Sequence, residues 1–123
     1  MRFEFNQHNV CLNPDIAYRW EKDRHNYVTI KVAQHPQTGR WGVGHNCCNN
    51  TNGFSGVSSP TSVDPHTIDS GYATRQEALS AKVRTLLDGE KGAISDAGLA
   101  ALRAYALVIG AVQPGDQLDL FAA

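Results

Sequence analysis

Histidine and cysteine are the side chains of this sequence that could ligate a metal or assist nucleophilic catalysis. In an extended strand His45 and Cys47 would point to the same face, and His8 with Cys11 would supply a second pair of ligands. No zinc-finger spacing results. Two interpretations remain, a metal site or a partly buried cysteine with surface histidines, and we predict the second, with no metal and no cofactor. The full set is His8, Cys11, His25, His35, His45, Cys47, Cys48 and His66.

Motifs that build catalytic or phosphate-binding loops are the next source of chemistry. A nucleophilic serine on a sharp turn needs the pattern Gly-x-Ser-x-Gly, which does not occur in the sequence. The glycine-rich segment Gly42–Gly56 lacks the Gly-Lys-Ser/Thr ending of a nucleotide-binding loop. We therefore predict that the protein is not an enzyme.

Length and composition predict one small domain. The chain has 123 residues, of which 41% are apolar, and this is enough for a single modest core. Its formal charge is −1, whereas a protein that mainly grips duplex DNA usually carries a strong basic surplus. The three cysteines form an odd set with two adjacent members, so no disulfide framework is indicated and a reducing cytoplasm is expected.

Export and membrane insertion are not predicted. The start of the chain, Met1–Asn6, lacks the unbroken apolar run of a signal peptide. The longest apolar stretch, Ala104–Val112, has nine residues, and a membrane helix needs about 20. We expect a cytoplasmic protein.

The first half of the chain shows mainly strand patterns. Arg2–Asn6 alternates in polarity as a short strand does, while Asp15–Arg24 is expected to hold a helical turn. Tyr27–Ala33 alternates as a strand with one wet face. The turn residues His35–Gly39 then lead into Arg40–Cys47, which resumes the alternation, so the two strands are predicted to form a hairpin.

Glycine and other small polar residues dominate the middle of the chain. Gly42 and Gly44 leave one face of the second hairpin strand bare, which allows either a close approach of backbone or helix, or room for a ligand. Asn46–Gly71 is predicted to be mostly loop. Phe54–Ser58 could add a third strand within it, and Ser59–Ser70 is a long connection of the kind that often carries function.

Two helices are predicted in the second half. The capping box Thr74–Glu77 starts the first, and Gly89 is a suitable stop. Ser95 caps the second, which ends at Gly110 or at Pro114-Gly115. This second helix is apolar on both sides, so it is either central to the fold or part of a partner interface.

The order of these elements predicts an α+β fold. We expect a small antiparallel sheet of about three to four strands covered on one face by two C-terminal helices, all in a single domain over residues 1–112. Residues 113–123 are expected to form a flexible C-terminal tail.

That tail contains Gln117, Leu118, Asp119, Leu120 and Phe121. It resembles the pentapeptide Gln-Leu-Ser/Asp-Leu-Phe by which many bacterial replication and repair proteins dock on the DNA polymerase sliding clamp. The resemblance implies that Leu120 and Phe121 fill an apolar pocket, Leu118 covers its rim and Gln117 anchors the peptide by hydrogen bonds. The alternative is that the three apolar side chains fold back and seal the chain's own core.

A second resemblance is topological. Residues 27–87 are similar in element order to the three-strand-plus-helix module of AP2-type and integrase N-terminal DNA-binding domains. In that module the exposed face of the sheet reads DNA, which implies Lys31, Arg40, Trp41 and His45 as contact residues here. The near-neutral charge and the long insertion Asn46–Gly71 depart from the pattern of those modules.

Three functions are therefore expected, in order of preference. The first is a non-enzymatic adaptor or modulator, associated with a phage or plasmid, that docks on the bacterial DNA polymerase sliding clamp. The second is a small inhibitor from a mobile element that binds a host defence protein through residues 46–71, with Trp41 and Phe54 as anchors. The third is a nucleic-acid-binding module that uses the sheet face to contact DNA.

Overall fold

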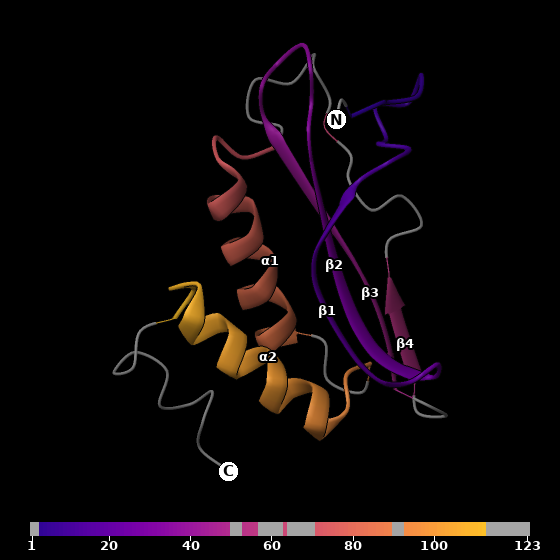
Figure 1. Cartoon of the computed structure of the whole chain (residues 1–123), viewed down its shortest axis with the longest axis vertical. Coiled ribbons are helices and arrows are strands. Elements are labelled where there is room, and N and C mark those ends of the chain that lie inside the picture. Colours follow the sequence, from indigo (N-terminus) through magenta and orange to yellow (C-terminus); the bar gives the residue numbers. More distant parts are fainter. Residues whose placement is uncertain (1–2, 50–52, 57–62, 64–70, 90–92, 113–123) are drawn as a thin grey trace.

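The fold is one antiparallel sheet with two helices on one of its faces (Figure 1). The computed structural model describes residues 3–49, 53–56, 63, 71–89 and 93–112. Within them the strands pair in the order β1-β2-β3-β4, each antiparallel to its neighbour. The elements are β1 (Asp15–Asp23), β2 (Asn26–Gln34), β3 (Trp41–Asn49), β4 (Gly53–Gly56), α1 (Arg75–Gly89) and α2 (Asp96–Val108). The predicted α+β architecture is confirmed.

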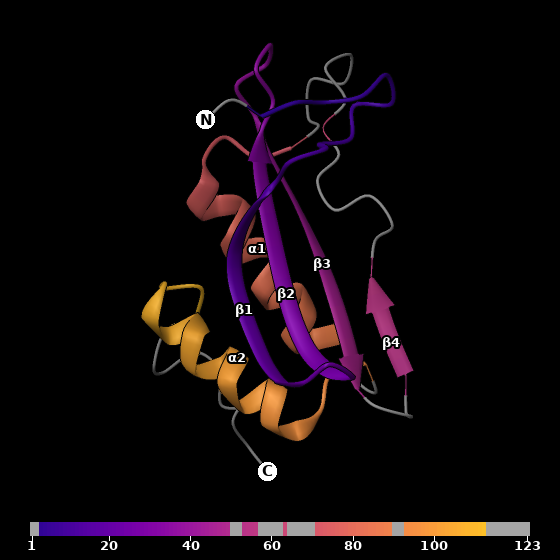
Figure 2. The same ribbon diagram turned by 45° about the vertical axis from the view of Figure 1, so that its right-hand side comes forward.

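The hairpin of β2 and β3 is the centre of the sheet, as Figure 2 shows. Val28, Ile30 and Val32 are fully buried, and the intervening residues of β2 point to the other face, which we call the outer face. Residues paired across an antiparallel ladder share a face, so Cys47, opposite Val28, also points toward the helices. The two strands predicted for this hairpin are confirmed, and each buries one side against the helices.

The segment 15–24 corrects one expectation, because it forms a strand and not a helical turn. β1 pairs with β2 over most of its length, with Tyr18 opposite Ile30 and Trp20 opposite Val28. Both aromatic rings pack against the core, while Arg19 points to the outer face. The alternation runs only from Tyr18 onward, because a register shift between Ile16 and Tyr18 leaves the apolar Ile16 exposed on the outer face, and this irregularity weakened the strand signal.

A strand was also predicted at Arg2–Asn6, and the described part of that segment, residues 3–6, does not form one. Residues 3–13 contain an isolated bridge between Phe5 and Cys11 and form no extended strand. The chain turns back too soon for a ladder, since the Asn6 amide donates to the Val10 carbonyl at 3.0 Å and Asn9 has a φ of 62°. Asparagine tolerates this left-handed conformation better than most residues, which explains the turn.

Both predicted helices are confirmed with their caps. The Thr74 hydroxyl accepts from the Glu77 amide at 3.1 Å, and the Ser95 hydroxyl accepts from the Gly98 amide at 3.1 Å. Gly110 follows α2 with a φ of 75°, as helix-ending glycines do. Among the described residues, no helix combines the length and the apolar character that crossing a bilayer requires.

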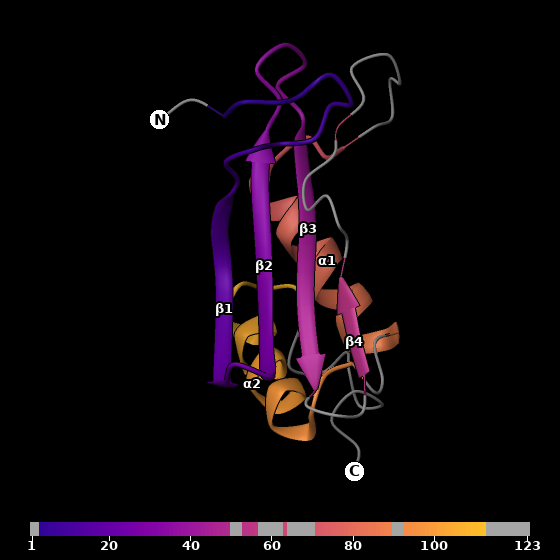
Figure 3. The ribbon, with the colours of Figure 1, turned by 90° about the vertical axis from the view of Figure 1, so that its right-hand side faces the viewer.

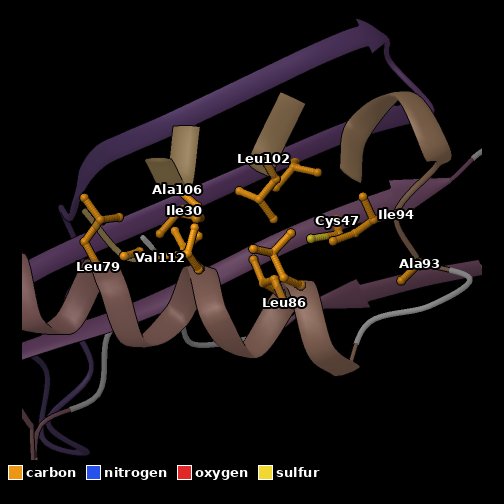
Figure 4. Packing of buried hydrophobic residues seen from close by; sticks show 13 residues of the cluster. Ile30, Cys47, Leu79, Leu86, Ala93, Ile94, Leu102, Ala106 and Val112 are labelled. Atoms are coloured by element: carbon orange, nitrogen blue, oxygen red, sulfur yellow. The ribbon is translucent and has the colours of Figure 1, made fainter. Parts of the chain in front are cut away.

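The core lies between the helices and the sheet, as Figure 4 shows for side chains of both layers. Leu86 from α1, Leu102 from α2 and Ile30 from the sheet belong to one hydrophobic cluster, and all three are fully buried. α2 buries one side only, because Val108 on its far side is 82% exposed. The sequence left open whether this helix is central to the fold or part of a partner interface. One of its faces is buried in the core, and the other is exposed to solvent.

Candidate functional site

The predicted clamp-binding residues, Gln117, Leu118, Asp119, Leu120 and Phe121, lie outside the described residues. The described fold ends at Val112, which is buried together with Ala111. The Ala111 amide donates to the Ala106 carbonyl at 2.9 Å, and Arg84 of α1 donates to the Ala111 carbonyl at 3.3 Å. These contacts fix the point from which the chain continues, and four residues separate Val112 from Gln117.

The predicted loop surface 46–71 is described only in part. The sequence allowed a strand at Phe54–Ser58, and β4 forms at Gly53–Gly56. Residues 57–58 and the Phe54 side chain lie outside the described part of the chain. Val63 is fully buried, and its amide donates to the Asn9 carbonyl at 3.0 Å. This contact joins the middle of the loop to the N-terminal segment.

The predicted sheet residues do not share one face. Lys31 points to the outer face, where it is paired across the ladder with Gly44. His45 points to the helix side, is only 6% exposed, and has its Nδ1 3.1 Å from Nζ of Lys82 on α1. A ligand on the outer face can therefore reach Lys31 and cannot reach His45, which corrects the expectation that both lie on an exposed sheet surface.

Arg40 and Trp41 lie at the start of β3, where they join distant segments of the chain. The Arg40 guanidinium donates to the Gly71 carbonyl at 3.0 Å. The backbone of Trp41 pairs with that of Tyr72, and its ring meets Phe3 edge-on with centroids 6.1 Å apart. Both residues therefore make contacts that stabilise the fold. They lie near the end of β3 away from Gly44, the residue that pairs with Lys31.

Histidine and cysteine do not gather into a ligand set in the described part of the chain. His45 and Cys47 share the helix side of β3, as the alternation predicted. Cys11 and Cys47 are buried, and Cys48 is half buried. Among the described residues, no group of three His, Cys, Asp or Glu side chains could hold a metal ion.

The outer face of β1, β2 and β3 carries a hollow of about 400 Å³ that the sequence did not predict. In Figure 3 this face of the sheet is turned toward the viewer, with the helices behind it. Among the described residues that line it, Arg19, Arg24 and Lys31 are the cations and Glu21 is the one carboxylate. The charge of the hollow is therefore positive, although that of the whole chain is slightly negative.

Arg19 organises the centre of this hollow. Its guanidinium donates to the Thr29 hydroxyl at 2.8 Å and to the Glu21 carboxylate at 2.7 Å, and it lies 5.6 Å from the centroid of the Tyr27 ring. The side chains of Arg19 and Glu21 are each 45% exposed, so their ion pair is screened by water and contributes little to stability. It does hold the guanidinium in place on the sheet.

Sequence reasoning missed Arg19 and Arg24 because their segment was expected to be a helical turn. Only a strand at residues 15–23 brings Arg19 beside Lys31, since the two are close across the ladder and not along the chain. The period-two placement of charges in β1 was the available signal.

The positive hollow on the outer face has the charge that binds an anion.

Two tyrosines on the opposite side of the sheet have shifted pKa values. Tyr18 and Tyr105 stack with centroids 4.3 Å apart. Burial raises the pKa of Tyr18 to about 12, with the nearby Tyr105 adding to the shift, and burial also raises the pKa of Tyr105. Both phenols stay protonated at neutral pH and act as packing groups.

Comparison of the chain with protein-family models, with curated proteins and with solved structures finds no match. Its function has to be argued from its own residues.

Proposed function

We propose that this protein is a non-enzymatic adaptor or modulator that docks on the bacterial DNA polymerase sliding clamp in the cytoplasm, in the context of a phage or plasmid. The observation that carries the proposal is the pentapeptide Gln117–Phe121, which places glutamine, two leucines and phenylalanine in the order of the clamp-binding motif. A five-residue pattern with a fixed order of anchors is more specific than composition or fold.

The chemistry of these residues suits a reversible contact. Burying Leu120 and Phe121 in an apolar pocket contributes roughly 1.5–3 kcal/mol for each side chain. Ordering the peptide on binding takes back part of this free energy, so a single copy should bind with a Kd in the micromolar range. Contacts of this strength tether a protein to its partner without locking it there.

The sequence that precedes the pentapeptide supports an external role for it. The buried cluster of the described residues draws its members from residues 28–112, with Ala111 and Val112 as its last contributors. Pro114 and Gly115 follow, and both residue types interrupt regular structure. The fold-back alternative would need Leu118, Leu120 and Phe121 to join that cluster.

Within this proposal the protein is either a tether or a blocker. A tether raises the local concentration of the folded domain at the clamp without a new contact. A blocker occupies the same pocket against host polymerase or repair proteins, and it would need contacts from the domain in addition to the pentapeptide. Competition against a labelled clamp-binding peptide separates the two, since only a blocker displaces that peptide well below micromolar concentrations.

The test is a pair of matched variants in the full chain. Leu120→Ala with Phe121→Ala should abolish binding to the clamp, because it removes both pocket anchors, while Ala122→Ser with Ala123→Ser should bind as the unchanged protein does. Thermal unfolding of both variants is measured alongside. Retained binding by the first variant would refute the docking proposal, and a loss of several kcal/mol of stability in it would support the fold-back alternative.

A further inference from the structure

The positive hollow on the outer face is a site that the clamp proposal does not use. It lies on the opposite side of the sheet from both helices, and its lining comes from β1, β2, β3 and the turn that joins β1 to β2. Four polar or aromatic groups line it between the cations, namely Glu21, Tyr27, Thr29 and Asn46. A volume of about 400 Å³ is within the range of ligand sites.

The three cations form a line along the strands. Arg19 lies opposite Thr29, and Lys31 is two residues further along β2, which at the rise of a strand is about 7 Å. Arg24 lies in the turn at the other end, beyond Asn26, so the line from Lys31 to Arg24 is roughly 17 Å long. A single small anion cannot contact charges spread over this length.

We propose that this line of cations binds the phosphate backbone of a nucleic-acid strand lying along β1 and β2. Successive phosphates present the separated negative charges that Arg19, Arg24 and Lys31 match. Arginine donates hydrogen bonds to phosphate oxygens, and Thr29 and Glu21 each accept from one terminal nitrogen of Arg19, which fixes its guanidinium and leaves one further N–H on each nitrogen.

The groups between the cations fit the same ligand. The Tyr27 ring lines the hollow with the Arg19 guanidinium over it, so a base can stack against this pair, as bases stack on aromatic and arginine side chains in proteins that bind single strands. Asn46 offers both a donor and an acceptor to sugar or base edges. The charge of Glu21 opposes binding of a phosphate, and this repulsion outweighs the benefit of the hydrogen bond by which Glu21 fixes the Arg19 guanidinium.

Three phosphate contacts predict weak, salt-dependent binding. For a single strand, the logarithm of the binding constant falls with the logarithm of the salt concentration at a slope of about −0.7 per neutralised phosphate. With three contacts, affinity should fall about 20-fold between roughly 50 and 200 mM salt. A site of such low affinity suits a protein that a second interaction, such as the proposed docking on the clamp, already holds near nucleic acid.

The experiment measures binding of the full chain to a fluorescent single-stranded oligonucleotide of roughly 12 nucleotides at several salt concentrations. Arg24→Gln with Lys31→Gln leaves one of the three cations and should reduce the loss across the same salt range to about 3-fold. Arg19 is left unchanged, because Thr29 and Glu21 depend on it. Glu21→Gln should bind the oligonucleotide more tightly, since it removes the carboxylate from the hollow.

Arg75→Gln is the matched control, because Arg75 is an exposed cation at the start of α1, on the far side of the sheet. It should leave both affinity and salt slope unchanged. The proposal is overturned if Arg24→Gln with Lys31→Gln binds as the unchanged protein does while remaining folded by circular dichroism. It is also overturned if inorganic phosphate or polyglutamate binds as tightly as the oligonucleotide, since the site would then take single anions or any polyanion.

Discussion

Ser95 joins two parts of the fold through one hydroxyl group. This hydroxyl accepts from the Gly98 amide at 3.1 Å, which caps α2, and donates to Oδ1 of Asn26 at 2.9 Å. Asn26 is 4% exposed and lies at the start of β2, so Ser95 ties the beginning of the helix to the end of the first hairpin. Ser95→Ala removes both hydrogen bonds at once.

The expected cost of Ser95→Ala follows from these two losses. Removing a serine cap costs about 1 kcal/mol, and leaving the buried Asn26 oxygen without a partner costs about 1–3 kcal/mol. We therefore expect the free energy of unfolding to fall by about 2–4 kcal/mol, and the Tm to fall on the order of 10 °C. Thr74→Ala is the control, since Thr74 caps α1 from an exposed position, and it should cost only about 1 kcal/mol.

The assay is urea unfolding of four proteins, namely the unchanged chain, Ser95→Ala, Asn26→Ala and the double variant. Because the two side chains contact each other, their effects should be coupled by about 1–2 kcal/mol. A coupling near zero, or a Ser95→Ala effect no larger than that of Thr74→Ala, would refute the reasoning that Ser95 holds the helix against the hairpin.

Three further predictions concern other parts of the fold. Gly98→Ala should lose about 1 kcal/mol of stability in urea unfolding, because the new Cβ would lie 3.0 Å from the rigid ring of Trp20 and this outweighs the gain in helix propensity. Gly71→Ala should lose about 1–3 kcal/mol in the same assay, because Gly71 has a φ of 81° and the Cβ would lie 2.9 Å from the Trp41 carbonyl oxygen. Tyr18 has a folded pKa of about 12 against an ordinary value of 10.0, so its contribution to stability is complete below pH 10 and lost as the pH rises toward 12. The Tm of Tyr18→Phe should therefore fall less between pH 10 and pH 12 than the Tm of the unchanged protein. An equal fall in both proteins would contradict the raised pKa of Tyr18.

The elements with strong local signals could be predicted from the sequence. β2 alternates because Val28, Ile30 and Val32 are buried on one side, and the sequence shows this directly. Both helix starts are encoded by side chains that bond to their own helices, so Thr74 and Ser95 could be recognised without any tertiary contact. Strand alternation and helix caps depend on residues that are close in the chain, so they can be recognised from the sequence.

The elements that depend on distant partners could not be predicted. β1 is stabilised by its ladder with β2 and by the stacking of Tyr18 on Tyr105 of α2, and neither contact leaves a local pattern. The hollow on the outer face arises only when Arg19 is brought beside Thr29, ten residues away along the chain. Lys31 was predicted for this face, but its neighbours were not, because they are neighbours across strands.

The most direct test of the central claim is calorimetric titration of the full protein, and of the same chain lacking residues 117–123, into a bacterial sliding clamp. Docking through the pentapeptide predicts micromolar or tighter binding by the full protein and none by the shortened chain. Absence of binding by the full protein, or equal binding by both, would contradict the claim.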